Sequence, residues 1–464
     1  MNRVSFTWAI LVATFAVLLW AVPEVAAQEK RVESEIEKDL AKIGRDLILN
    51  KRYLPQDFSQ STFEELWKDW PAELREQARQ ASPEERRAMS FARYGFTPRD
   101  DDPEQPLQLV QDEAGYYALN CFTCHAGAAA GTAYEGLPNS QINLQTMYED
   151  LRRTKTRLKI PFGEMDAGSI AVSMGGSRGT TNAVVFGIVL MSYRDKDLNV
   201  KLFSIPRPSV VSHDMDAPPW WNVGKRDRLY IDGFVEKNHR ALIPFVMDRR
   251  NRGRKLRGWE SEFESIFAYI ENLQPPMYPF AIDQELAEQG REVFTNHCAE
   301  CHGTYGDEPT YPAKIVELAE IGTDPVRLHA LTEHDRQVYH ESWYAHYGAD
   351  DTVIAPKGYQ APPLDGVWAS APYFHNGSVA TVREVILPAE RATNWKRIPN
   401  EFDTQRVGLN VEHLESIPAA ARRKELYREY FDTRKKGKSA AGHEFGDLLD
   451  EEQVLQLLEY LKTL

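Results

Sequence analysis

Cysteine is scarce in this 464-residue chain, which has only Cys121, Cys124, Cys298 and Cys301. These four cysteines fall in two copies of one pattern, CFTCH and CAECH, so none is left over for a disulfide elsewhere. A bridge between two cysteines so close in sequence would be strained. A zinc site would not require a histidine directly after each pair. The scarcity and the pattern together exclude a disulfide-stabilised scaffold.

The chain also lacks an excess of basic residues and, beyond its first 27 residues, any apolar run long enough to span a membrane. Its 55 Lys and Arg against 69 Asp and Glu give a net charge of −14, which argues against nucleic acid as a partner. Residues 1–27 combine Arg3, an apolar run to Val22 and small residues ending at Ala27, which is typical of a secretory signal peptide. An uncleaved N-terminal membrane anchor is the alternative. We expect a periplasmic or secreted protein.

Two copies of C-x-x-C-H predict two covalently bound c-type haems. The two cysteines of a copy lie on one helical turn and reach the two vinyl groups at one edge of a porphyrin. The histidine that follows then reaches the iron as the proximal ligand. Cys121 and Cys124 would thus bind the first haem covalently, with His125 as its iron ligand. Cys298 and Cys301 would bind the second haem, with His302 as its iron ligand.

Methionine is absent after Met277, so the second haem cannot take a methionine ligand from its own part of the chain. Its distal ligand must then be sought among histidines. His375, beside an Asn-Gly turn signal, and His443, in a glycine-flanked loop before the last helix, have unusual settings. The other candidates are His329, His334, His340, His346 and His413. A His/His haem has a lower reduction potential than a His/Met haem.

The first haem has no such histidine nearby, since the next one after His125 is His213. Met174 and Met191 lie at sequence distances where a small cytochrome c places its methionine ligand. Met191, however, follows the apolar run AVVFGIVL, where methionine is usually a gap-filler. The alternative is an iron with a vacant site for peroxide or dioxygen. The residues favour the vacancy without deciding the question.

The helical patterns predict a mainly α fold of two cytochrome c-like haem domains with long loops and an extended N-terminal helical region. Asp283 is a predicted N-cap of the helix before CAECH, and Asp450 with Gln453 forms a predicted capping box for a closing amphipathic helix. These two helices are the pair that cross in a cytochrome c. We expect a signal peptide at 1–27, an N-terminal haem domain at 28–278 and a C-terminal cytochrome c domain at 282–464. Pro275 and Pro276 begin the linker.

Two further features invite a functional reading. Trp220 and Trp221 follow a double proline, and either serves as core packing or carries electrons between two haems. Six basic residues between Arg249 and Arg257 form either a solvated charged face or partners for haem propionates.

With these residues in view, the chain resembles the bacterial di-haem cytochrome c peroxidase superfamily, and within it the branch that contains the rubber oxygenases. The resemblance rests on NCFTCHAG, PPWWNVGKRDRLYIDG, NHCAECHGTYG, APPLDGVWASAPYFHNGSVATV and AGHEFGDLLDEEQ. It implies a reactive N-terminal haem, an electron-handling C-terminal haem and a Trp221 placed between them. The peroxidases ligate the second haem with a methionine at an offset that falls here near Pro388 and Ala389. That departure favours His443 ahead of His375.

We therefore expect an exported oxidoreductase of the di-haem peroxidase or oxygenase type, in which peroxide or dioxygen reacts at the N-terminal haem. A redox protein would donate or accept electrons at the C-terminal haem, and haem-attachment machinery would mature the chain. The peroxidases carry a histidine soon after their first haem motif that leaves the iron on activation, and this chain has none there. The alternative is a non-catalytic periplasmic electron-transfer cytochrome with both irons six-coordinate.

Overall fold

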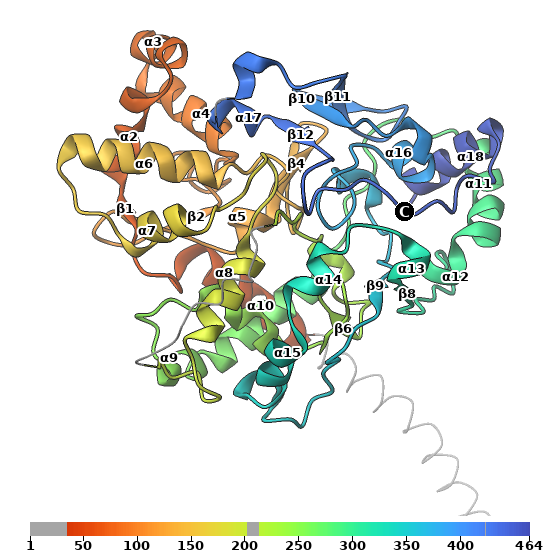
Figure 1. The fold of residues 1–464 in the computed structure, drawn as a ribbon, viewed down its shortest axis with the longest axis horizontal. Coiled ribbons are helices and arrows are strands. Elements are labelled where there is room, and N and C mark those ends of the chain that lie inside the picture. The colour runs from red at the N-terminus through yellow and green to blue at the C-terminus, as the bar shows by residue number, and fades with distance from the viewer. Residues whose placement is uncertain (1–34, 202–212, 423) are drawn as a thin grey trace, which may run out of the picture.

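The computed structural model describes residues 35–201, 213–422 and 424–464, so the leader-like residues 1–27 lie outside the described residues. The fold is a mixture of helices and small antiparallel sheets, and the expectation of a mainly α fold with two cytochrome c-like haem domains is wrong (Figure 1). Many of the strands are only two to four residues long. Such strands are too short to show the alternation of apolar and polar residues that predicts a strand from sequence.

The first part of the chain packs helices around a three-stranded sheet of order β1-β3-β2. Ser82 and Glu85 form a capping box at the start of α4, and Gly95 ends that helix in the left-handed conformation with φ 77°. After a helical segment at 35–50, the elements are β1 (Phe58–Ser59), α2 (Gln60–Glu64), η1 (Leu66–Asp69), α3 (Ala72–Gln80), α4 (Pro83–Tyr94), β2 (Leu109–Gln111) and β3 (Tyr116–Leu119).

The middle of the chain contains the first C-x-x-C-H motif and the expected closing helix, which is α10. Its elements are α5 (Phe122–His125), β4 (Ala126–Ala129), β5 (Thr132–Glu135), α6 (Leu144–Leu158), α7 (Glu164–Ala171), α8 (Ala183–Ser192), η2 (Trp220–Asn222), β6 (Arg228–Leu229), β7 (Val235–Glu236), η3 (His239–Val246), α9 (Gly253–Arg257) and α10 (Glu260–Asn272).

The last part of the chain contains the second motif and the longest strands. Its elements are α11 (Gln284–His297), α12 (Ala299–His302), β8 (Ile315–Glu317), α13 (Leu318–Ile321), α14 (Val326–Ala330), α15 (Glu333–His340), η4 (Trp343–Ala345), β9 (Gly358–Gln360), η5 (Val367–Ala369), α16 (Val382–Ile386), η6 (Pro388–Glu390), β10 (Asn394–Asp403), β11 (Gly408–Leu414), η7 (Ala419–Arg422), α17 (Lys424–Tyr427), β12 (Tyr430–Asp432) and α18 (Glu451–Lys462).

Helices α11 and α18 pack against each other beside the second motif, as the sequence predicted (Figure 1). Asp283 accepts hydrogen bonds from the amides of Glu285 and Leu286, and the capping box of Asp450 with Gln453 starts α18. The helices approach so closely at Gly290 that a Cβ atom there would lie 1.9 Å from the carbonyl oxygen of Gln456. Only glycine fits this crossing point.

We predict that Gly290→Ala lowers the free energy of unfolding, because the added methyl group must push α18 away. Overpacking of this kind costs about 1–3 kcal/mol, which exceeds the gain of about 1 kcal/mol from better helix propensity. Thermal unfolding followed by circular dichroism measures the change. Gly187→Ala in α8 is the matched control, since the nearest atom to its Cβ would be 3.7 Å away. Equal melting temperatures for the two variants would contradict the close approach.

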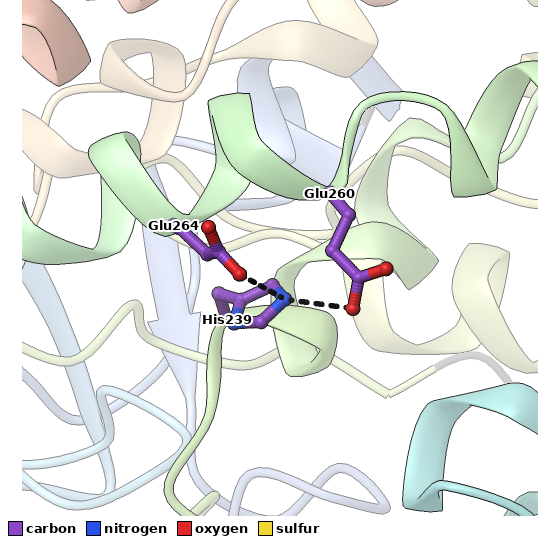
Figure 2. Close-up of side chains that lie close together, drawn as sticks. All are labelled: His239, Glu260 and Glu264. Carbon is purple, nitrogen blue, oxygen red and sulfur yellow. Dashed lines mark ion pairs between the residues drawn. The ribbon is translucent and has the colours of Figure 1, made fainter.

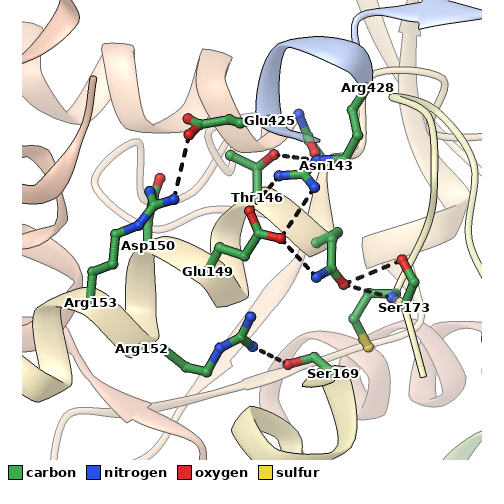
Figure 3. Close-up of polar contacts among 12 residues, drawn as sticks. Asn143, Thr146, Glu149, Asp150, Arg152, Arg153, Ser169, Ser173, Glu425 and Arg428 are labelled. Carbon is green, nitrogen blue, oxygen red and sulfur yellow. Dashed lines mark hydrogen bonds and ion pairs between the residues drawn. The ribbon is translucent and has the colours of Figure 1, made fainter. Parts of the chain in front are cut away.

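A strap formed by residues 424–438 crosses from the last part of the chain onto the first (Figures 1 and 3). Arg428 donates to Thr146 and to the carboxylate of Glu149 on α6, with the closest contact to Glu149 at 2.6 Å. Glu425 forms an ion pair with Arg153, also on α6, at 3.6 Å. Ion pairs that are partly shielded from water depend less on salt than exposed ones. The strap therefore fastens the two halves of the chain together.

Side chains cross the expected boundary near residues 278–282 in both directions. Trp221 packs in the core cluster of the second half with Trp368, whereas Tyr339 and Trp343 pack in the core of the first half. The division at 28–278 and 282–464 stays a prediction. Across residues 35–201, 213–422 and 424–464, no helix combines the length and apolarity needed to cross a bilayer.

Candidate haem sites

The first motif lies in the short helix α5, which is held between strands β3 and β4. The hydroxyl group of Thr123 donates to the carbonyl of Gln108 at 2.7 Å, and the side chain of Gln108 donates to the carbonyl of Ala126 at 2.8 Å. Asn139 donates to the carbonyl of Thr123 at 3.0 Å. All of these polar groups are buried and therefore need partners. The contacts fix α5 and the direction in which His125 leaves it.

The His125 ring is fixed by one hydrogen bond and one ring contact. Its Nδ1 lies 3.1 Å from the carbonyl oxygen of Pro218, so Nδ1 carries the proton and Nε2 keeps its lone pair. Trp220 stacks on the ring with centroids 4.6 Å apart and planes 22° apart. Burial lowers the pKa of His125 to about 4, so the imidazole is neutral near pH 7. A neutral ring with a free Nε2 is the form that binds a metal.

The second motif has the same arrangement in α12. The Nδ1 of His302 lies 2.8 Å from the carbonyl oxygen of Pro362, which leaves its Nε2 free, and burial lowers the pKa of this histidine. Gly303 follows with φ 80°, and a Cβ atom there would lie 1.9 Å from the carbonyl oxygen of Thr310. The glycine after the motif is thus required by the turn that closes over α12.

The two proline acceptors belong to segments that are bonded to each other. We call residues 218–222 and 362–366 the linking segments. Trp221 Nε1 donates to the carbonyl of Asp365 at 2.7 Å, and Asn222 donates to the carbonyl of Pro363 at 2.9 Å. Trp221 is buried between these segments, with Gly366 against its indole ring. Backbone and hydrogen bonds therefore connect Pro218, which accepts from His125, to Pro362, which accepts from His302.

His443 lies opposite His302. The two ring centroids are 6.3 Å apart, with planes 56° apart. A metal between two imidazoles adds about 2 Å of metal–nitrogen bond and about 1 Å from nitrogen to ring centre on each side, which totals about 6 Å. Burial, and then the charge of His302, lowers the pKa of His443 to about 4, so it too is neutral near pH 7. The spacing fits one metal ion held by two histidines.

The loop before His443 is tightly fixed. The amide of His443 donates to the carbonyl of Ile321 at 2.7 Å, and Arg391 donates to the carbonyl of Gly442 at 2.6 Å. Gly442 has φ 80°, and a Cβ atom on it would collide with Gly322 at 2.3 Å. His443 itself has φ 54°, which is strained for a residue with a side chain. The fold maintains this strain to hold the ring against His302.

His375 lies elsewhere, with its ring 4.7 Å from that of Tyr359. Burial, and then the charge of Arg327, lowers its pKa to about 3. Its carbonyl accepts the amide of Asp216 at 3.0 Å, next to the first linking segment. The structure therefore brings His443 to His302 and leaves His375 between the two sites.

One cavity of about 1030 Å³ connects both motifs and is lined by the four cysteines, His125, His302 and His443. This volume is at the upper end of the usual range for small-molecule sites, about 300–1000 Å³. The four thiols form no disulfide, and burial raises the pKa of Cys121 and Cys298 to about 12. Free thiols, neutral imidazoles and a large, mainly apolar cavity fit a covalently attached porphyrin.

The two methionines considered for the first iron differ in position. Met174 lines the cavity, whereas Met191 packs at the edge of the neighbouring core. The walls of the cavity also include apolar faces of α7 and of α8, a helix that is apolar along nearly its whole length. Among described side chains, the ring against His125 is Trp220, and no second histidine faces it as His443 faces His302.

A separate group of possible metal ligands, His239, Glu260 and Glu264, lies where η3 meets α10 (Figure 2). His239 Nε2 is 3.4 Å from Glu260 and 4.0 Å from Glu264. Arg240 already pairs with Glu260 at 2.5 Å. The group is therefore an ion-pair cluster at the surface, and we assign no metal to it.

The basic residues 249–257 mostly serve the surface of the first half. Arg249 lies over the ring of Tyr193, Arg250 pairs with Asp248, and Arg257 donates to the carbonyl of Asp197. The sequence did not identify the carbonyl groups of Pro218 and Pro362 as the hydrogen-bond acceptors of His125 and His302. The signal was available, because APPWWNV and APPLDGV repeat the same Ala-Pro-Pro motif.

Comparison with known families places a cytochrome c-like region in the last part of the chain. Residues 358–396 match the family model described as "RoxA-like, cytochrome c-like". The matched region contains Pro362, the acceptor of His302, and also His375. The match implies that this region belongs to a protein that binds haem c.

Two relatives come from Sinorhizobium fredii (strain NBRC 101917 / NGR234). Uncharacterized protein y4iM is 28% identical over 290 residues, which is 53% of this chain and 64% of that protein. Uncharacterized protein y4iJ is 27% identical over 258 residues, 41% of this chain and 41% of that protein. The chain thus spans less than two thirds of the length of either relative. The names of these two relatives state no activity.

Proposed function

We propose that the chain is an exported c-type cytochrome with two haems and acts as an oxidoreductase on peroxide or dioxygen. His125 would bind the reactive iron, and His302 with His443 would bind an electron-handling iron. The observation that carries the proposal is the difference between the two sites. His302 faces a second histidine at 6.3 Å, whereas the ring in contact with His125 is a tryptophan. A bound haem supplies the redox change of the iron and, where a coordination position is free, a place for the oxidant.

The protein orients the two proximal histidines through carbonyl groups rather than carboxylates. Pro218 and Pro362 each accept a hydrogen bond from Nδ1, at 3.1 Å and 2.8 Å respectively. A neutral acceptor leaves the imidazole less electron-rich than a carboxylate would. Trp220 covers the His125 ring and excludes water from that side. These contacts hold each Nε2 toward the cavity.

Burial favours the protonated form of two carboxyl groups that line the cavity. Burial raises the pKa of Asp216 well above its ordinary value, and one of its oxygens has no hydrogen-bond partner among the described residues. Burial, and then the neighbouring Asp248, raises the pKa of Glu164. Reduction of peroxide or dioxygen consumes protons, and these groups are placed to deliver them into the cavity.

The linking segments give electrons a short covalent and hydrogen-bonded route between the sites. Trp221 is buried in this route and bonds directly to Asp365, three residues after Pro362. We therefore propose Trp221 as the residue through which the sites exchange electrons. A redox protein as donor or acceptor, maturation by haem-attachment machinery and export through residues 1–27 belong to the same proposal.

The experiment is a visible and EPR spectrum of the purified protein, oxidised and then reduced with carbon monoxide. We expect one high-spin haem that binds carbon monoxide and one low-spin haem that does not. The second result follows from the two imidazoles at 6.3 Å, which leave no position for the gas.

Two low-spin haems that do not bind carbon monoxide would contradict the enzyme proposal and support an electron-transfer cytochrome. Met174 is the residue to test in that case, since it lines the cavity. Met174→Leu would then open the first iron to carbon monoxide. Met191→Leu is the matched control, because Met191 is not among the cavity-lining residues.

A further inference from the structure

A cluster of three arginines lies buried where α14 and α15 meet residues 226–232. Arg327 and Arg336 are each 1% exposed and share one carboxylate oxygen of Asp232, at 3.3 Å and 2.7 Å. Arg226, 8% exposed, also has Asp232 among the charges that raise its pKa, although burial is the larger effect and lowers it. Two guanidinium groups thus share one carboxylate oxygen, and the third lies near the same carboxylate.

Asp324, three residues before Arg327, forms no ion pair with these arginines among the described residues. Asp324 uses its two oxygens to accept the amides of Val326 and Ser439, at 2.9 Å and 3.0 Å. Arg336 has the carboxylate of Asp335 near it as well as that of Asp232. Arg327 has one ion pair among the described residues, the 3.3 Å contact with the Asp232 oxygen that it shares with Arg336. A buried guanidinium group that is paired so weakly is costly, and a ligand anion would stabilise it.

The hydrogen-bond donors of the cluster are also incompletely satisfied. Among the described residues, Arg327 Nε, Arg327 Nη2 and Gln360 Nε2 are buried without an acceptor. Gln360 is held by its other end, because Oε1 accepts from Nε and Nη2 of Arg226. Both Arg327 and Gln360 line the cavity that connects the two haem sites. Unsatisfied donors on a weakly paired guanidinium group and a neighbouring amide, both at the cavity wall, indicate a site for an anion.

The position of the donors indicates which anion this is. Gln360 comes two residues before Pro362, which holds the proximal histidine of the second site. Arg327 lies in α14, shortly after Ile321, whose carbonyl accepts the amide of His443. The donors therefore belong to the segments that support the two histidines, and they line the cavity that a group held by both would occupy. A haem carries two propionate carboxylates on the edge opposite its thioether bonds.

We propose that Arg327 and Gln360 bind a propionate of the haem held by His302 and His443, and that Arg327 sets the reduction potential of that haem. This inference rests on the proposed function, since it requires the second haem. The buried guanidinium group neutralises the propionate and places positive charge near the iron. Positive charge favours the reduced state, so its loss lowers the potential.

The test is a redox titration of the full-length haem protein, followed at the absorption bands of the low-spin haem. For Arg327→Gln we expect at least a tenfold fall in the reduction equilibrium constant, which is about 59 mV for one electron. Arg336→Gln is the matched control. Arg336 has the same burial and the same Asp232 partner but is not among the residues that line the cavity, so we expect a much smaller shift. Arg327→Lys keeps the charge and should restore most of the potential.

Equal potentials for Arg327→Gln and the wild type, with both haems present, would overturn this inference and leave the proposed function intact. An equal shift in Arg336→Gln would also overturn it, because the effect would then be one of general charge. Absence of a low-spin haem from the wild type would instead contradict the proposed function. If Arg327→Gln does not fold, Gln360→Glu applies the same test, since a carboxylate at this position repels the propionate. An unchanged potential in that variant would count against the proposal.

Discussion

His443→Ala should convert the low-spin haem of the oxidised protein to a high-spin or weakly ligated form. The ring of His443 lies 6.3 Å from that of His302, the spacing of two imidazoles on one metal, and alanine leaves that side without a ligand. Visible and EPR spectra would report the change as loss of the low-spin signal. The reduced variant should also gain a second equivalent of carbon monoxide binding.

His375→Ala is the control for this prediction. His375 is also buried and also lines the cavity, but its ring packs on Tyr359 rather than facing His302. Its removal should leave the low-spin signal in place. An unchanged signal in His443→Ala, together with its loss in His375→Ala, would reverse the assignment of the distal ligand.

Replacing both cysteines of one motif should remove one haem and leave the other. Cys121→Ala with Cys124→Ala should reduce the covalent haem content by half, and Cys298→Ala with Cys301→Ala should do the same. The first pair should abolish the carbon monoxide-binding signal and the second pair the low-spin signal. Stability should fall as well, because an empty half of the 1030 Å³ cavity loses the packing that a porphyrin provides.

Haem content by pyridine haemochrome and intact mass measure this outcome. A protein that keeps both haems after either double replacement would show that the cysteines are not the attachment points. A wild-type protein with a single haem would contradict the proposed number, and the two double variants would then identify the motif that is used.

The parts of the site that a sequence can predict are those carried by short, contiguous patterns. The C-x-x-C-H pattern itself identifies the candidate cysteines and histidine. The N-caps Asp283 and Asp450 predict where their helices begin, because capping is a local interaction. The absence of methionine after Met277 narrowed the distal ligand to histidines. Each of these conclusions needs only neighbouring residues or a residue count.

The rest depended on contacts between distant parts of the chain. The sheets β1-β3 and β8-β9 are built from strands of two to four residues that lie far apart in the sequence, and their pairing is decided by tertiary packing rather than by alternation. For the same reason, the helical periodicity of the sequence predicted a mainly α fold and did not reveal the small sheets. The arginine cluster is equally invisible in sequence, because Arg226, Asp232 and Arg327 meet only in the folded protein.

The linking segments have a thermodynamic consequence. His125 and His302 are each hydrogen-bonded to a proline carbonyl, and the two carbonyls belong to segments that are hydrogen-bonded to each other through Trp221 and Asn222. If both histidines bind haem iron, as proposed, a shift of one histidine on a change of ligation is transmitted through these bonds to the other. Binding free energies coupled in this way are reciprocal. An oxidant that binds more tightly at His125 when the other iron is reduced must raise the potential of that iron by the same free energy, so each site reports on the occupancy of its neighbour.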